Sequence, residues 1–356
     1  MTEAELLKKK QKNFRAVGYA LFAVAMGLLI ARILSNLLYG YLDGKMSELT
    51  LEIVIDVVFT VLVQVVSLVI IPFTIYKLTL KTTTKDVLFM SNYAKTDWRI
   101  CLCAFGIGAC GLFVTMFVST IWQSILISFG YSYSSSTVMP DSFNFFHFLL
   151  MMTLTAVLPA LCEEFVNRGL FLNVLRNSFG VPLTIVLAGI GFGLFHQHVS
   201  QVFYTALMGA LLAYLVLTTK SIWPAVIVHF TNNALSVVLD FWDTYNLFGS
   251  NPYDIINTLI QTAPIVILLF VAGCVALIFL LLKTIKRIHA RSFSDKFLKM
   301  LSGEIIDGNA ISGIASPYVT ADFARYKPCA KDWVFYIGAV FVTVINTLFT
   351  FIWGLF

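Results

Sequence analysis

Residues 262–282 read TAPIVILLFVAGCVALIFLLL, a run of 21 residues that contains no charged side chain. The hydrocarbon core of a bilayer is about 30 Å thick, and a helix needs about 20 consecutive apolar residues to cross it. This run is long enough, and it therefore predicts a membrane-spanning α-helix.

Further apolar segments of similar character occur along the whole chain. Hydrophobic residues make up 59% of the 356 residues and charged residues only 12%, about half the charged fraction of a typical soluble domain, which is roughly 25%. The sequence therefore predicts an all-α, polytopic transmembrane helix bundle of about nine spans. The other eight segments are 14–38, 50–76, 98–128, 145–176, 181–199, 202–218, 222–240 and 332–356.

Lysine and arginine are concentrated in every second loop. They precede the first span and follow the second, fourth, sixth and eighth, whereas loops 39–49, 129–144 and 241–261 contain a single lysine among them. Because cytoplasmic loops are enriched in these residues, we expect a cytoplasmic N-terminus, in an integral membrane protein of a bacterial plasma membrane. The formal net charge of +5 is then explained by the loops, and we expect no nucleic-acid partner.

The chain divides into three parts by composition and motif content. We expect N-terminal transmembrane helices in 1–144, a catalytic core in 145–240, and C-terminal transmembrane helices in 241–356. The last part includes a long polar stretch, 284–331, which we interpret as a cytoplasmic linker before the final span. A P-loop, a dinucleotide-binding fingerprint and an HExxH motif are all absent from the sequence.

Ionisable residues inside membrane spans are costly, so each is a candidate functional residue. The sequence Glu163-Glu164-Phe165-Val166-Asn167-Arg168 lies in the fourth apolar segment. On a helix, Glu164 and Arg168 share a face and can form an ion pair, whereas Glu163 points about 100° away from Glu164. Glu163 is then available for chemistry. The alternative is a helix end at the interface, with all three charges in water.

Two more polar groups follow on the next apolar segments. Phe192 and His196 are four residues apart, as are His229 and Asn233, so each pair shares a helix face. Structural explanations exist for both pairs, because a histidine inside an apolar helix is often a hydrogen-bonded core residue, and Asn and His commonly form hydrogen bonds between membrane helices.

These groups are predicted to lie at similar depths. We counted 1.5 Å per residue from helix ends near Arg176, Val181 and Lys220. On this scale Glu163, His196 and Asn233 lie about 20, 22 and 20 Å from those ends, and His229 lies about 13 Å deep. Three neighbouring antiparallel helices would thus bring them together, if the fourth helix continues to Arg176 and bends near Pro159.

Together the three groups resemble the CPBP family, which comprises the type II CAAX prenyl endopeptidases and their bacterial relatives, also described as CAAX or bacteriocin-processing (Abi) membrane proteases. Members carry EExxxR, then FxxxH, then HxxxN or HxxxD on successive transmembrane helices. The resemblance covers about residues 145–240, and no motif position departs from the pattern. The motifs stand here as Glu163-Glu164…Arg168, Phe192…His196 and His229…Asn233.

The resemblance implies intramembrane peptide hydrolysis that depends on a glutamate and needs no cofactor. By this resemblance, Glu163 would be the general base that activates water, and His196 would help to hold that water. His229 and Asn233 would form the oxyanion site. Glu164 and Arg168 would set the helix geometry, supported by Phe192. The implied partners are membrane lipid and a peptide or lipidated protein substrate, prenylated or of bacteriocin type.

Two other functions remain open from the sequence. Glu163, His196 and His229 would also make a two-histidine, one-carboxylate zinc site. The protein would then still hydrolyse peptides, but through a zinc ion. A non-catalytic membrane protein, such as a scaffold, an immunity factor against a peptide toxin or a transporter, belongs to a different class. Internal symmetry typical of transporters is not evident in the sequence.

Overall fold

A computed structural model describes residues 3–132, 139–301 and 325–355, with the backbone only for 293–301. The described residues are mostly helical and contain no strand, which confirms the all-α prediction. Eight helical stretches are long and apolar enough to cross a membrane. They are α1 (Glu3–Leu42), α2–η1–α3 (Glu48–Thr60, Val61–Ile70 and Ile71–Leu80), α5 (Trp98–Ser128), the continuous Phe145–Ser178, α10 (Val199–Thr219), α11 (Trp223–Tyr245), α13 (Pro264–Leu301) and α15 (Ala330–Trp353).

The remaining predicted span, 181–199, is shorter than expected. Helix α9 (Val181–Phe195) has 15 residues and is therefore about 22 Å long, and the predicted segment 181–199 overran its end. The chain turns at Gln197, which has a left-handed φ of 50°, and α10 begins two residues later. The polar residues His196, Gln197 and His198 form this turn, and the predicted segment ran through them.

The polar stretch 284–331 is only partly a linker. Helix α13 continues without a break to Leu301, so the first part of this stretch is helical rather than a loop. Residues 302–324 of the predicted linker lie outside the described residues. Two short helices occupy predicted loops: α4 (Thr84–Met90) and α12 (Pro252–Thr262).

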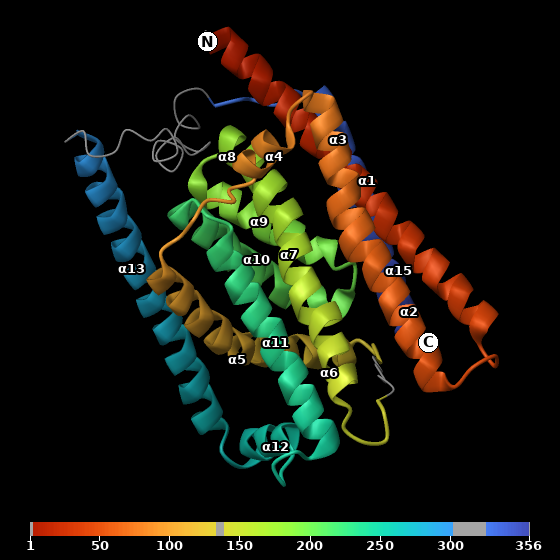
Figure 1. The fold of residues 1–356 in the computed structure, drawn as a ribbon. Helices are drawn as coiled ribbons and strands as arrows, with labels where there is room; N and C mark the ends of the chain where they lie inside the picture. The colour runs from red at the N-terminus through yellow and green to blue at the C-terminus, as the bar shows by residue number, and fades with distance from the viewer. Residues whose placement is uncertain (1–2, 133–138, 302–324, 356) are drawn as a thin grey trace.

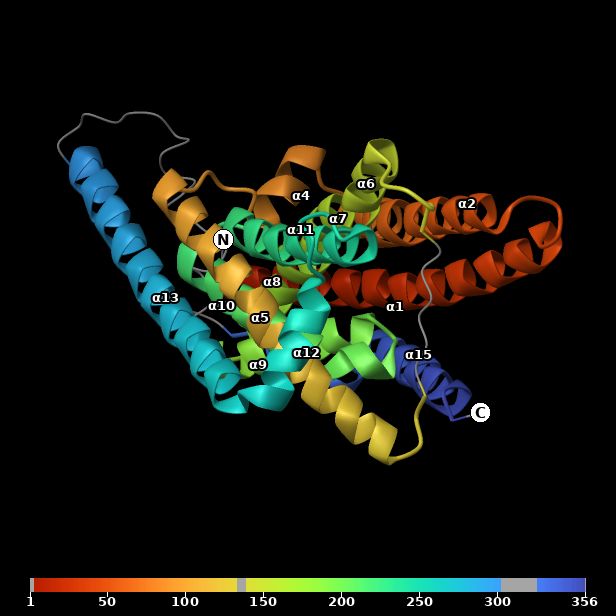
Figure 2. The same cartoon turned by 90° about the horizontal axis from the view of Figure 1, so that it is seen from below.

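The helices from α6 to α11 lie in the middle of the molecule (Figures 1 and 2). Helices α1, α2–α3 and α15 lie together on one side of them, and α5 and α13 lie on the other. The first and last helices pack directly against each other, although they are far apart in the sequence. The central helices are thus enclosed by elements from both ends of the chain.

Two hydrophobic clusters meet at the central helices. One contains side chains of α1, η1, α3 and α15, and the other contains side chains of α5, α9, α10, α11 and α13. Phe171 packs against both clusters. The outward faces are also apolar: Leu269 of α13 is 68% exposed and Phe341 of α15 is 64% exposed. Large apolar surfaces of this kind are stable in lipid, so the fold is that of an integral membrane protein.

Candidate active site

The helix that carries the two glutamates is irregular on both sides of them. A π-helical turn, η2 (Thr153–Val157), precedes α7 (Leu158–Glu164), and a second one, η3 (Phe165–Phe171), follows it before α8 (Leu172–Ser178). Pro159 lies in the first turn of α7, where its missing N–H removes a backbone hydrogen bond. π-Turns inside helices occur frequently at functional sites. The predicted continuation of this helix to Arg176 is confirmed.

Glu164 lies at the centre of a buried ionic network. Its side chain is fully buried, and its Oε1 accepts hydrogen bonds from Arg168 Nη1 and His229 Nδ1, each at 2.9 Å. Arg168 also donates from Nη2 to the Gly209 carbonyl at 3.1 Å and lies 4.3 Å from the Phe192 ring centre. The predicted pair of Glu164 with Arg168 is therefore present, and it connects η3 to α9, α10 and α11.

Glu163 has a different environment from its neighbour. Its side chain is 14% exposed, and Oε1 accepts a hydrogen bond from Gln64 Nε2 at 2.9 Å. Oε2 lies 4.0 Å from His229 Nε2. That separation is too long for a direct hydrogen bond, and a gap of this size between two polar atoms is commonly bridged by water.

His196 caps the C-terminal end of α9, where its ring is held by backbone. Its Nδ1 lies 2.9 Å from the Phe192 carbonyl oxygen, and the ring packs edge-on against the Phe192 ring, with centroids 4.9 Å apart. A carbonyl oxygen only accepts, so Nδ1 carries the hydrogen and Nε2 of the neutral ring is left as an acceptor.

Asn233 is held by a backbone carbonyl of the neighbouring helix. Its Nδ2 donates to the Thr155 carbonyl in η2 at 3.0 Å, and its Oδ1 accepts from Asn232 Nδ2 at 3.3 Å. An amide nitrogen has two hydrogens, so one N–H of Asn233 remains available. Asn232 also accepts from Thr115 of α5, the interhelical role common for such residues.

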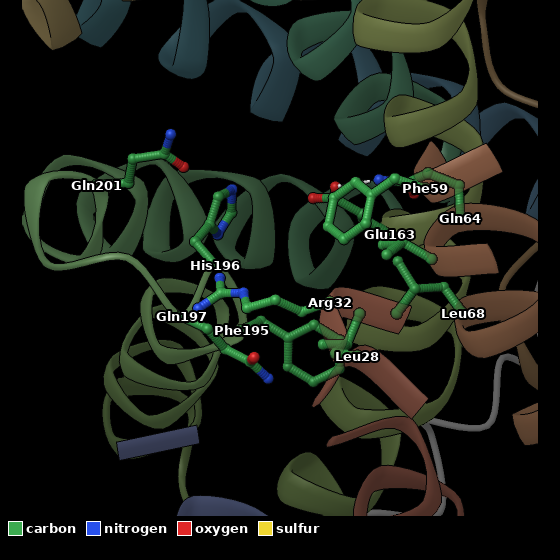
Figure 3. Close-up of a pocket in the computed structure, with 11 residues that line it drawn as sticks. Leu28, Arg32, Phe59, Gln64, Leu68, Glu163, Phe195, His196, Gln197 and Gln201 are labelled. Atoms are coloured by element: carbon green, nitrogen blue, oxygen red, sulfur yellow. Dashed lines mark hydrogen bonds between the residues drawn. The ribbon is translucent and has the colours of Figure 1, made fainter. Parts of the chain in front are cut away.

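These side chains surround one large cavity of about 830 Å³. Glu164 and Arg168 lie behind its wall, whereas the other candidates face it. A smaller cavity adjoins it, and Figure 3 shows Glu163, hydrogen-bonded to Gln64, and His196 among the residues that line this second space. The sequence-predicted residues that line the larger cavity are Glu163, Phe192, His196, His229 and Asn233.

Several residues of the site were not found from the sequence. Gln64 lies in η1, 99 residues before Glu163, and Gln201 of α10 lines both cavities. Arg32 of α1 lines the smaller cavity. A polar residue inside a predicted apolar span was the available signal for Arg32 and Gln64, but no local spacing connects either residue to the glutamates.

The candidate zinc ligands are Glu163, His196 and His229. Among the residues that the structure describes, no group of three or more His, Cys, Asp and Glu side chains is arranged to hold a metal ion. Glu163, His196 and His229 therefore do not form a ready zinc site in this arrangement. The Nδ1 atoms of two of them have other partners, Glu164 for His229 and a carbonyl for His196, and such bonds are also usual for histidines that ligate a metal through Nε2.

Residues 145–235 match the model of a protein family described as type II CAAX prenyl endopeptidase Rce1-like. The chain carries a domain of this family. The CAAX endopeptidase match runs from the first residue of α6 into α11 and contains all seven candidate residues, whereas Gln64 and Arg32 lie outside it. Neither the curated proteins nor the solved structures that we compared with the chain gave a match. At the level of the family, this match supports a CAAX-type membrane endopeptidase.

Proposed function

We propose that this chain is a glutamate-dependent intramembrane endopeptidase in which Glu163 is the general base. The observation that carries the proposal is the contrast between two adjacent carboxylates. Glu164 is buried and bound by Arg168 and His229, whereas Glu163 opens to the large cavity opposite His229 Nε2. One carboxylate thus holds the helices together and the other is free to take a proton.

The proposed reaction is the addition of water to a peptide carbonyl carbon. Water near Glu163 Oε2 loses one proton to that carboxylate as the water oxygen attacks the carbonyl carbon. His196 Nε2 accepts a hydrogen bond from the remaining O–H of the water and so orients it. The proton then passes from Glu163 to the leaving nitrogen as the C–N bond breaks. The products are a carboxylic acid and an amine, and no group is oxidised or reduced.

The negative charge that develops on the carbonyl oxygen needs donors. A His229 ring protonated on both nitrogens donates from Nδ1 to Glu164 and from Nε2 to the oxyanion, and the available N–H of Asn233 provides a second donor. A single oxyanion donor contributes roughly 3–4 kcal/mol in enzymes.

In this proposal the helices between residues 145 and 240 form the catalytic core, and the flanking parts 1–144 and 241–356 complete its walls. The substrate is a peptide or lipidated protein at the membrane, of prenylated or bacteriocin type. The basic loops support a cytoplasmic N-terminus.

The test is cleavage of quenched fluorescent peptides, prenylated and unprenylated, by the detergent-purified full chain. Glu163→Gln keeps the size of the side chain and removes the base, so kcat should fall by at least about 10²-fold. Glu48→Gln is the matched control, because Glu48 is an exposed carboxylate in the first turn of α2, and its kcat should equal that of the wild type.

The same assay is repeated with a strong chelator. Loss of cleavage in Glu163→Gln with full activity in chelator supports the metal-independent mechanism. Loss in chelator, restored by added zinc, would favour the zinc alternative. Full activity of Glu163→Gln, or no cleavage of any peptide by the wild type, would contradict the proposal, and the latter result would favour a binding or immunity function.

A further inference from the structure

Arg32 is an arginine inside a predicted membrane span, on the same face of the helix as the buried Leu28 and Ser35. It lies in α1, and its neighbours Ile33 and Leu34 are 50% and 47% exposed apolar side chains. A charged side chain at such a depth is costly and is retained mainly where it has a functional partner. Arg32 itself turns inward and lines a cavity.

The structure gives Arg32 no anionic partner. Its Nη1 donates to Asn346 Oδ1 of α15 at 3.1 Å, and within the described parts of the chain it forms no ion pair with a carboxylate. Arg168 and Arg15 differ in this respect, since Glu164 and Asp332 bind them at 2.9 and 2.6 Å. A neutral amide leaves most of the five N–H donors of a guanidinium without an acceptor.

The cavity that Arg32 lines adjoins the proposed catalytic residues. It has a volume of about 240 Å³, against about 830 Å³ for the larger cavity. Both cavities share Phe59, Gln64, Glu163, His196 and Gln201 as lining residues. Figure 3 shows the Arg32 side chain among the lining residues, with its guanidinium toward the side where His196 and Gln197 lie. Glu163 and His196 therefore stand at the junction of a small cavity that contains the Arg32 guanidinium and a large one.

We propose that Arg32 forms a carboxylate-binding subsite that receives the free C-terminal carboxylate of the substrate peptide. The inference rests on the proposed function, because it places the scissile bond at the junction beside Glu163. The short segment on the C-terminal side of that bond occupies the small cavity, and the rest of the substrate occupies the large one. The fixed position of Arg32 then selects bonds near the C-terminus.

The chemistry of the two groups is matched. A guanidinium binds a carboxylate through two parallel N–H···O bonds, and charge-assisted bonds of this kind are roughly twice as strong as neutral ones. A terminal amide, by contrast, has no charge and would present an N–H to a donor. An aspartate or glutamate side chain near the terminus has the same carboxylate chemistry, so the test must separate these two sources.

The first experiment measures binding and does not depend on cleavage. The probes are acetyl-Val-Leu-Leu as free acid, the same peptide as C-terminal amide, and acetyl-Val-Asp-Leu amide, titrated calorimetrically into the detergent-purified full chain. Wild type should bind the free acid at least about tenfold more tightly than its amide. Arg32→Gln should bind both with the affinity of the amide, and Arg32→Lys should lie between.

Arg99→Gln is the matched control, because Arg99 is also an arginine of a spanning helix but is paired with Asp97 at the helix end. It should keep the wild-type preference. Tight binding of the aspartate peptide amide would assign the subsite to side-chain carboxylates instead of the terminus. Equal binding of acid and amide by wild type, a preserved preference in Arg32→Gln, or no measurable binding of any probe would overturn the proposal.

The second experiment repeats the comparison with longer cleavable peptides. If the proposed function holds, wild type cleaves the free acid with a kcat/KM at least about tenfold above that of the amide, and Arg32→Gln cleaves both at the rate of the amide. Failure of the subsite alone would show as equal cleavage of both peptides. Failure of the proposed function would show as unchanged cleavage in Glu163→Gln, whatever the calorimetry gives.

Discussion

Glu163 and Glu164 are adjacent in the chain, and we propose a catalytic role for Glu163 and a structural role for Glu164. The side chain of Glu164 is completely buried between Arg168 and His229, and that of Glu163 is partly open to the cavity. A buried ion pair contributes little net stability, but removal of one partner leaves an uncompensated charge. Stability and activity should therefore respond differently to the loss of each carboxylate.

Glu164→Gln should destabilise the protein, and Glu163→Gln should not. The first change leaves the fully buried Arg168 without its counter-charge, which costs about 3–5 kcal/mol. The second replaces a partly exposed side chain whose neighbour, Gln64, can also pair with an amide, so the cost should stay under about 1 kcal/mol. Thermal unfolding of the two detergent-purified variants beside wild type measures the difference. Equal shifts in Tm would show that Glu164 is not the structural member of the pair.

Part of the site could be predicted at this scale from local spacing. The pairing of Glu164 with Arg168 followed from two positions four residues apart, and it is present although η3 is not a regular α-helix. Gln64 could not be found this way, because its contact with Glu163 spans 99 positions and depends on how whole helices pack. Arg32 lay inside the predicted first span, yet its proposed role depends on a cavity that only the packed bundle forms.

At the scale of elements, the sequence predicted where the helices are better than how they end. Segment 98–128 corresponds to α5 residue for residue, since Asp97 caps its start and Gly130 follows its end. The end of α9 was placed four residues too late, because the predicted segment ran through the polar turn residues His196, Gln197 and His198. The π-turns on either side of α7 were not predicted either, as apolar composition is the same in α- and π-helical turns.

The contact between α9 and α10 depends on glycines that face the ionic network. A Cβ atom at Gly209 would lie 2.7 Å from Phe192 Cβ and 3.1 Å from Gly189 Cα. These atoms belong to or adjoin the backbone of α9, so the two helices would have to separate. Gly209 also supplies the carbonyl that accepts from Arg168. Tight helix packing and the position of Arg168 are thus linked at one residue.

Gly209→Ala should therefore lower both stability and activity. The added methyl group overpacks a closed interface, at a cost of about 1–3 kcal/mol, and moves Arg168 and Phe192 relative to His229. Gly273→Ala is the control, because a Cβ at that position of α13 meets nothing within 4 Å. Unfolding temperature and peptide cleavage measure both effects. A Gly209→Ala protein as stable and active as Gly273→Ala would contradict the packing argument.

At the scale of the whole molecule, the ends of the chain complete a site whose motifs lie in the middle. The matched segment ends at residue 235, yet Asn346 of α15 donates to Gln197 and accepts from Arg32. Gln64 comes from η1. The segment with the family motifs thus provides the proposed catalytic groups, and the flanking helices fix the turn after His196 and the second cavity.

Asp332 fixes the last helix to the first. Its carboxylate accepts from Arg15 Nε of α1 at 2.6 Å, from the Tyr326 hydroxyl, and from the Cys329 N–H at 2.8 Å. The Asp332 side chain is fully buried, whereas that of Arg15 is 40% exposed. The exposed arginine can be solvated when the pair is lost, so the larger penalty falls on the buried donors, chiefly the tyrosine hydroxyl.

Asp332→Ala should consequently loosen α15 and weaken the site at a distance. Three lost hydrogen bonds at about 1 kcal/mol each amount to about 3 kcal/mol of stability. If α15 shifts, Asn346 releases Gln197 and Arg32, so cleavage of a free-acid peptide should fall more than cleavage of its amide. Asp254→Ala, at an exposed position in α12, should change neither quantity. A destabilised Asp332→Ala protein that cleaves both peptides at wild-type rates would show that α15 supports the fold without shaping the cavity, and would separate the architecture of the bundle from the selection of substrate.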